Sequence, residues 1–134
     1  MNRTFIDTVY VLALLNARDR WHRKAVELSG TLRGPLVTSN AVLTEVADAL
    51  ANRNQRARAS QAIDDFQSDP DVTCVSIDKN AFSAALKLYR DRPDKDWSLT
   101  DCISFTIMRE QRVTDALTAD IHFVQAGFRA LMRE

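Results

Sequence analysis

Apolar residues along the chain follow two patterns, one typical of short strands and one typical of helices. Compact apolar runs predict strands, and apolar residues three or four positions apart predict helices. The predicted strands cover residues 4–7, 36–38, 72–77, 113–118 and 128–132. The predicted helices cover residues 9–16, 21–32, 41–52, 55–67, 78–89, 98–111 and 120–126. Because strands and helices alternate, we expect an α/β protein with a mostly parallel sheet covered by helices on both faces.

Turn and cap residues separate these elements. Gly34 and Pro35 end the second helix, and Ser39 or Asn40 is a suitable N-cap for the third. The chain has no internal repeat and no low-complexity segment, and its 134 residues suit one domain with one core. We therefore expect residues 1–134 to form a single α/β domain.

The composition is that of an ordinary globular protein. Hydrophobic residues make up 46% and charged residues 27% of the chain, which argues against intrinsic disorder. No apolar run approaches the roughly 20 residues that span a bilayer. The opening segment carries Asp7 inside its first apolar stretch, unlike a signal peptide, so the expectation is a cytoplasmic protein.

The charges balance, with 18 Lys and Arg against 18 Asp and Glu. A nucleic-acid-binding protein is often strongly basic, so a nucleic-acid surface on this chain has to be a local one. Two basic clusters are candidates for such a surface, and both also fit ordinary solvated helix faces. They consist of Arg18, Arg20, Arg23 and Lys24, and of Arg53, Arg56 and Arg58.

Cysteine and histidine are too few and too scattered for a structural zinc site. Such a site usually takes four Cys or His ligands at short spacings. This chain offers only Cys74, Cys102, His22 and His122, all far apart in the sequence. The pattern instead indicates two small buried cysteines and a supporting role in the fold for His122.

Four acidic residues fall where a parallel sheet places its ligands, outside the carboxyl ends of the strands. Asp7 ends the first strand, and Asp120 lies two residues past Thr118. Asp101 lies in the first turn of the helix that leads into that later strand. Glu45 lies little more than one turn into the helix after the second strand, within roughly 10 Å of the same edge. All four acids can therefore converge on one side of the sheet.

Each acid also has an interpretation without catalysis. Ser98 and Asp101 fit a capping box, and Asp7 and Asp120 are each placed to cap the helix that follows. Glu45 is harder to explain in this way, because it lies at the edge of an apolar helix face rather than opposite to it. From spacing alone, independent structural roles and a shared metal site both remain open.

A converged cluster of acids would have a definite chemistry. Carboxylates gathered in one place repel one another and are costly to desolvate, and a bound cation relieves both effects. Hard oxygen ligands favour Mg²⁺ or Mn²⁺ over zinc. One or two such ions can activate water for in-line attack on phosphorus, which points to phosphodiester hydrolysis.

The segments around these acids resemble those of the PIN-domain family of nucleases, over nearly the full chain. Each segment is short, but together they carry four acids in the order that the family shows. The segments are residues 5–8 with 19–25, 39–46, 98–105, and 116–123 with 125–128. The resemblance implies a PIN-like three-layer α/β/α sandwich with a central, mostly parallel sheet of four to five strands.

The resemblance also implies a function, a Mg²⁺- or Mn²⁺-dependent ribonuclease that binds one or two ions. The expected metal ligands are Asp7, Glu45, Asp101 and Asp120, with Thr8, Ser39 and Thr118 as supporting hydroxyls. A compact chain of this type is similar to the toxin of a VapC-like toxin–antitoxin pair. That similarity implies an RNA substrate, a homodimer, and a small antitoxin protein supplied by another chain.

Other classes of protein fit part of the pattern. A PIN-like RNA-processing nuclease without an antitoxin would have the same site. A non-catalytic RNA-binding or interaction module would gain nothing from concentrated negative charge facing phosphate. A phosphatase of the haloacid dehalogenase type needs an acid where Val9 stands, and a receiver domain needs adjacent acids near the end of the first strand. Three glycines in the whole chain exclude a phosphate-binding glycine-rich loop.

Overall fold

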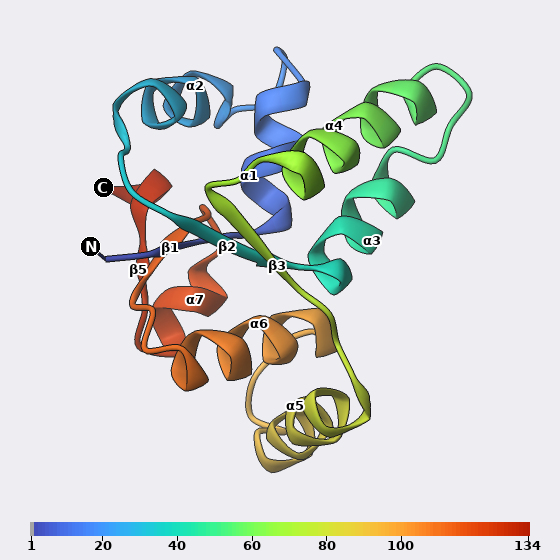
Figure 1. Ribbon diagram of the computed structural model, residues 1–134. Helices are drawn as coiled ribbons and strands as arrows, with labels where there is room; N and C mark the ends of the chain where they lie inside the picture. Colours follow the sequence, from blue (N-terminus) through green and yellow to red (C-terminus); the bar gives the residue numbers. More distant parts are fainter. Residues whose placement is uncertain (1) are drawn as a thin grey trace.

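The computed structural model describes residues 2–134 and contains a five-stranded sheet with helices on both faces (Figure 1). The strands lie in the order β3-β2-β1-β4-β5, so the first strand of the chain is in the middle of the sheet. Their bounds are β1 Thr4–Ile6, β2 Leu36–Ser39, β3 Val72–Val75, β4 Asp115–Leu117 and β5 Arg129–Ala130. Every pairing is parallel, and the predicted α/β/α architecture is confirmed.

The helices begin close to the residues at which the sequence places them. They are α1 Thr8–Leu15, α2 His22–Thr31, α3 Asn40–Ala49, α4 Arg56–Ser68, α5 Lys79–Asp91, α6 Leu99–Glu110, α7 Ile121–Gln125 and the 3-10 helix η1 Leu131–Arg133. Of the two candidate caps of α3, Ser39 is the one that accepts a backbone N–H of the helix. Asp78 caps α5 in the same way. Within residues 2–134, no helix is long and apolar enough to cross a membrane.

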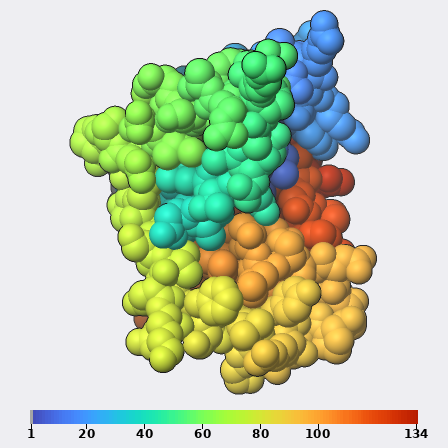
Figure 2. All heavy atoms as spheres, turned by 90° about the vertical axis from the view of Figure 1, so that its right-hand side faces the viewer, coloured from blue at the N-terminus to red at the C-terminus, as the bar shows by residue number. Residues whose placement is uncertain are grey.

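The chain reverses its direction across the sheet at β1. From β1 it moves outward to β2 and β3, with α1 to α4 on the upper face of the sheet in Figure 1. It then returns under the sheet through α5 and α6 to β4, on the other side of β1. The switch point therefore lies at the carboxyl ends of β1 and β4, where open α/β sheets bind ligands. Figure 2 looks onto this edge, where teal atoms of α3 meet orange atoms of α6.

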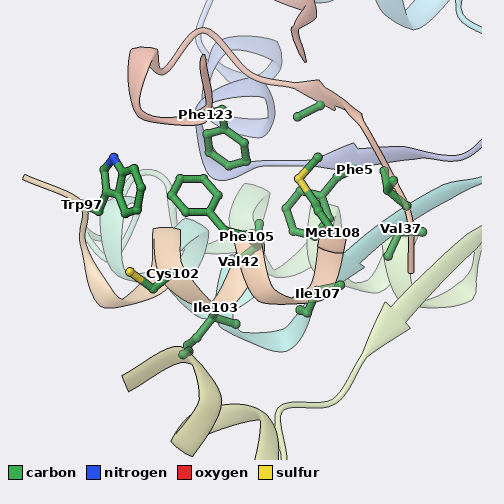
Figure 3. Close-up of a cluster of buried hydrophobic side chains, with 13 residues drawn as sticks. Phe5, Val37, Val42, Trp97, Cys102, Ile103, Phe105, Ile107, Met108 and Phe123 are labelled. Carbon is green, nitrogen blue, oxygen red and sulfur yellow. The ribbon is translucent and has the colours of Figure 1, made fainter. Parts of the chain in front are cut away.

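Successive side chains of each strand point to opposite faces of the sheet, and this divides the core into two clusters of buried side chains. In β1, Phe5 faces the layer of α5, α6 and α7, whereas Ile6 faces the layer of α1 to α4. Figure 3 shows the first cluster, in which Phe105 of α6 lies beside Phe123 of α7 and Ile103 points toward α5. Both faces of the sheet are therefore buried, as expected for parallel strands.

A row of aromatic rings fixes α6 against the end of the sheet. The ring of Phe105 makes edge-to-face contacts with Trp97 and Phe123, at 5.0 Å and 4.9 Å between ring centroids. Such a contact adds about 0.5–1.5 kcal/mol beyond the burial of the rings. Phe105 lies one helical turn after Asp101, and Phe123 lies three residues after Asp120. The aromatic row thus holds two of the acid-bearing segments together.

Some strands are shorter than the sequence predicts. The prediction of a strand over residues 128–132 is wrong beyond residue 130, because residues 131–133 form the 3-10 helix. Leu131 and Met132 are buried against the layer of α1, and the N–H of Met132 donates to the carbonyl of Thr118 at 3.1 Å. A short apolar run fits either a strand or a buried helical turn, so the pattern alone does not distinguish them.

Candidate active site

Asp7 is the most deeply buried of the four acids, with 4% of its surface exposed. It occupies the N-cap position of α1 but makes no side-chain capping hydrogen bond, so its interpretation as a helix cap is wrong. Its Oδ2 instead accepts a hydrogen bond of 2.7 Å from the hydroxyl of Thr118, just past the end of β4. The same hydroxyl accepts the backbone N–H of Asp120 at 3.0 Å. A single threonine hydroxyl therefore joins the ends of β1 and β4.

Asp101 lies in the first turn of α6 and completes the capping box that the sequence predicts. Its backbone N–H donates to the Ser98 hydroxyl at 3.0 Å, and its Oδ2 accepts the backbone N–H of Ser98 at 3.1 Å. The same Oδ2 lies 3.0 Å from Nδ1 of His122. Asp101 is therefore a helix cap and a member of the acid cluster at once.

Asp120 caps α7, because its Oδ1 accepts the backbone N–H of His122 at 2.9 Å. The imidazole of His122 lies back over this cap, with Nδ1 3.2 Å from the same Oδ1. Ligand atoms of Asp101, Asp120 and His122 all lie within 4.8 Å of one another, a grouping that can hold a metal ion. One imidazole nitrogen thus bridges two carboxylates that come from different elements.

Glu45 joins the site through a different contact. It is half-buried on α3, and its Oε1 accepts a hydrogen bond from the hydroxyl of Thr8, the residue after Asp7. The hydroxyl of Ser39 instead accepts a backbone N–H of α3 at 3.2 Å and so begins that helix. Of the three hydroxyls that the resemblance implies, Thr8 and Thr118 therefore bond to acids, whereas Ser39 stabilises the helix that carries Glu45.

The four carboxylates share one arrangement. In each, one oxygen accepts hydrogen bonds from neighbouring protein groups, and the other makes none within residues 2–134. The held oxygens are Oδ2 of Asp7, Oε1 of Glu45, Oδ2 of Asp101 and Oδ1 of Asp120. Holding one oxygen orients a carboxylate and leaves the other oxygen for a ligand, as hydrogen bonds around metal sites do.

Burial and the charges of neighbouring acids disfavour the charged forms of Asp7 and Asp101. Desolvation, followed by the charges of Asp101 and Asp120, raises the pKa of Asp7 from 3.8 to about 7, against the opposing hydrogen bond from Thr118. Desolvation also raises the pKa of Asp101, with the charge of Asp120 acting in the same direction and the N–H of Ser98 opposing it. The charge of Asp120 therefore acts on both Asp7 and Asp101, and the charge of Asp101 acts on Asp7.

A divalent cation would relieve this electrostatic cost, because a positive charge among carboxylates favours their ionised form. Carboxylate oxygens suit hard cations such as Mg²⁺ and Mn²⁺. The group formed by Asp101, Asp120 and His122 supplies two carboxylates and one imidazole, without a thiolate. The chemistry of the donors is thus consistent with a divalent metal site.

His122 is a further neighbour of the acids that the sequence pattern does not indicate. The sequence assigns it only a supporting role in the fold, whereas its ring lies against two carboxylates. The available signal is the spacing of Asp120 and His122 at the start of a short helix. An Asp cap bends the first turn, and this brings the side chain two residues later back toward the cap.

Residues 4–129 match the PIN domain family, a span that contains all four acids. The chain belongs to the PIN-domain family. It is 30% identical over 124 residues to the 23S rRNA-specific endonuclease VapC20 of Mycobacterium tuberculosis. The matched region covers 92% of this chain and 94% of that relative. The PIN-domain, VapC-like character that the sequence predicts is thereby confirmed.

Solved structures agree with the sequence relationship. The crystal structure of Mycobacterium tuberculosis VapC20, described as a toxin that cleaves the sarcin-ricin loop, matches with a TM-score of 0.86 at 28% identity. That match covers 93% of this chain and 95% of the VapC20 chain. A toxin–antitoxin complex from Klebsiella pneumoniae matches with a TM-score of 0.60 at 17% identity, over 88% of this chain and 87% of that one. This second likeness concerns the fold alone.

Proposed function

We propose that this PIN-domain chain is a Mg²⁺- or Mn²⁺-dependent endoribonuclease and the toxin of a toxin–antitoxin pair. The proposed metal ligands are Asp7, Glu45, Asp101 and Asp120, with one or two ions bound. The observation that carries the proposal is the acid cluster at the carboxyl ends of β1 and β4. Each carboxylate there keeps one oxygen free of hydrogen bonds within residues 2–134. In this proposal residues 1–134 act as a single nuclease domain.

The relatives indicate which substrate to test first. VapC20 is named a 23S rRNA-specific endonuclease, and its crystal structure is described as that of a toxin that cleaves the sarcin-ricin loop. Identity of 30% over 92% of the chain supports extending endonuclease activity on RNA to this protein. Because proteins recognise RNA loops by their shape and by unstacked bases, the particular loop depends on contacts around the acid cluster.

The contacts within the cluster have a common role in such a reaction. A bound ion supplies positive charge that shields a phosphate from the acids and acts as a Lewis acid. Thr118 and Thr8 orient two of the carboxylates, and His122 holds the other two at a fixed separation. Since free carboxylates would rotate away from one another, these donors keep the ligand oxygens in place before an ion and RNA arrive.

The first test is cleavage of total RNA and of an isolated 23S rRNA loop by purified protein, with Mn²⁺, Mg²⁺ or EDTA. Asp7→Asn and Glu45→Gln remove one ligand each and preserve the size of the side chain. Asp48→Asn removes an exposed carboxylate from α3 and serves as the matched control. We expect metal-dependent cleavage by the wild type and the control, and a loss of about 100-fold or more in the ligand variants.

The outcomes separate the alternatives that the sequence leaves open. Equal cleavage by Asp7→Asn and the wild type would assign the activity to a contaminant or to another site. No cleavage in any metal, by folded protein free of bound inhibitor, would refute the nuclease and favour an RNA-binding module. An RNA-processing nuclease would cleave in the same way, but the product of a neighbouring small reading frame would not inhibit it.

The toxin role implies two protein assemblies. The similar structure from Klebsiella pneumoniae is a toxin–antitoxin complex, and for this chain we infer a small antitoxin that blocks the acid cluster and a homodimer of the toxin. An arginine of the antitoxin inserted among the acids would form charge-assisted hydrogen bonds with the free carboxylate oxygens. Co-expression with the neighbouring reading frame, followed by light scattering, tests both assemblies. A monomer that stays active in the presence of that product would refute them.

A further inference from the structure

A hollow of about 570 Å³ lies between the end of α5 and the start of α6. Its lining consists of three cations, one acid and four uncharged residues, which are Arg90, Arg92, Lys95, Asp96, Tyr89, Pro93, Trp97 and Ser98. The backbone N–H of Ser98 donates to Oδ2 of Asp101 at 3.1 Å, so the hollow adjoins the acid cluster. In Figure 2 the yellow-orange atoms of this segment lie beside the orange atoms of α6, on the face where the strands end.

The cations of this hollow differ in how far they are already neutralised. The guanidinium of Arg92 forms two hydrogen bonds of 3.0 Å with Asp94 and lies over the ring of Trp97, 5.0 Å from its centroid. Arg92 is thus a fixed part of the wall. Lys95 is 3.8 Å from Asp94, the long limit of an ion pair. Arg90 makes no hydrogen bond or ion pair within residues 2–134, so its charge is free to meet an anion.

An aromatic ring lies beside these cations. Tyr89, in the last turn of α5, is 48% exposed, whereas Trp97 is 4% exposed and belongs to the core. Exposed aromatic rings next to cations are the arrangement with which proteins bind single-stranded nucleic acid, because the ring stacks on a base and the cations meet the backbone. Since Arg90, Arg92 and Lys95 outnumber the single acid of the lining, Asp96, the hollow fits a nucleotide better than an apolar partner.

We propose that this hollow binds a nucleotide of the RNA strand that flanks the bond cleaved at the acid cluster. Tyr89 stacks on the base, and Arg90 and Lys95 contact the phosphate backbone. The inference rests on the proposed nuclease function and adds the position of a flanking nucleotide. Four carboxylates repel an incoming RNA strand, and positive charge at their edge offsets this repulsion and retains the strand.

Binding is tested in the Asp7→Asn background, which is expected not to cleave, with a fluorescent single-stranded RNA of about eight nucleotides. Tyr89→Leu should weaken binding about tenfold through the loss of stacking. Arg90→Gln should lower the slope of log affinity against log salt concentration by about 0.7, the effect of one phosphate contact on a single strand. Arg112→Gln removes an exposed charge at the far end of α6 and should change neither quantity.

Cleavage kinetics provide a second readout in the otherwise wild-type protein. A contact made equally in the bound substrate and the transition state changes KM and leaves kcat unchanged. Tyr89→Leu and Arg90→Gln should therefore raise KM several-fold, with kcat close to that of the wild type. A fall in kcat at constant KM would overturn the role as a binding subsite. Thermal melting of each variant checks that these exposed replacements leave the fold intact.

The outcomes distinguish failure of the subsite from failure of the nuclease. Unchanged RNA affinity in Tyr89→Leu and Arg90→Gln, while the wild type cleaves, would overturn the subsite and leave the nuclease standing. A wild type that cleaves no RNA but binds it through these residues would refute the nuclease and support the hollow as an RNA site. A change from dimer to monomer in these variants, with RNA affinity intact, would make the hollow a protein interface and refute the proposal.

Discussion

Replacement of Asp7 by Asn is expected to stabilise the metal-free protein while it abolishes cleavage. Asp7 is 4% exposed, and its carboxyl group accepts one hydroxyl hydrogen bond, from Thr118. Burial and the neighbouring acids raise its pKa from 3.8 to about 7, so the folded protein holds this proton more tightly than the unfolded chain does. At neutral pH and without a metal, the charged Asp7 therefore opposes folding.

The size of this effect follows from the two pKa values. As the pH rises past 3.8, the unfolded chain loses the proton first, and stability falls until the folded protein ionises near pH 7. Each pH unit in this window lowers the free energy of unfolding by about 1.4 kcal/mol, a total of about 4 kcal/mol at pH 7.5. The amide oxygen of Asn can still accept the hydrogen bond from the hydroxyl of Thr118. Its buried NH₂ group loses hydrogen bonds to water, however, which lowers the free energy of unfolding of the variant by about 1–2 kcal/mol. The expected net gain is about 2 kcal/mol, or about 8 °C in melting temperature.

Urea denaturation in EDTA between pH 5 and pH 8 measures this gain. Because the wild type recovers stability as Asp7 takes up its proton, the advantage of Asp7→Asn should shrink by about 2–3 kcal/mol from pH 8 to pH 5. Asp48→Asn, which alters an exposed carboxylate, should follow the wild type at every pH. Saturating Mn²⁺ should reverse the order, since a ligand at 100 times its Kd stabilises the wild type by about 3 kcal/mol.

Two results would contradict the reasoning. If Asp7→Asn were no more stable than the wild type in EDTA at pH 8, burial would not be destabilising the ionised carboxylate. A gain of the same size at pH 5 and pH 8 would assign the effect to packing instead of charge. Either result would also weaken the case for a metal, because the cost of ionising Asp7 is what a cation at this position would relieve.

Other contacts around the acids can be tested in a similar way. His122→Asn puts an amide N–H near the position of Nδ1 and should largely keep the affinity for Mn²⁺, whereas His122→Ala should lower that affinity about 10–100-fold. Titration calorimetry measures both affinities. Equal losses in the two variants would mean that the ring has another role. Thr118→Val removes the hydroxyl that lowers the pKa of Asp7, so the acidic limb of the pH–rate profile should move to higher pH. An unmoved limb would contradict the role of this hydroxyl in the ionisation of Asp7. Phe105→Ala should lower the free energy of unfolding, measured by urea denaturation, by about 3–5 kcal/mol. A decrease below about 1 kcal/mol would show that the aromatic row does not fix α6.

Much of the fold is predictable because its signals are local. Ser39 and Asp78 cap helices that start where hydrophobic periodicity also begins. The alternation of helices and strands requires crossover connections, and from these a parallel sheet follows. The order of the strands is not a local property, since β1 pairs with β4 across most of the chain. The short 3-10 helix at residues 131–133 likewise depends on where the end of β4 lies.

The candidate site is predictable as a set of residues but not as a set of contacts. The sequence treats capping and clustering as alternatives, yet Asp101 and Asp120 do both. In each, the oxygen that accepts the capping N–H also lies beside the imidazole of His122, and the other oxygen is left for a ligand. The spacing of Asp120 and His122 is a local signal for the cap, but the approach of the His122 ring to Asp101 on α6 joins two elements and requires the folded structure. The raised pKa of Asp7 depends on burial by several elements, and so requires the folded structure.

The central position of β1 also bears on how the protein is made. Asp7 is synthesised first, but the hydroxyl of Thr118 that holds it lies 111 residues later, and Asp120 later still. At about 5–20 residues per second, roughly 6–20 s of translation separate the two ends of the site. Throughout that interval the growing chain carries only part of its acid cluster. If the protein cleaves ribosomal RNA, as proposed above, the ribosome that makes it is not exposed to a finished site until Thr118 and Asp120 have been added to the chain.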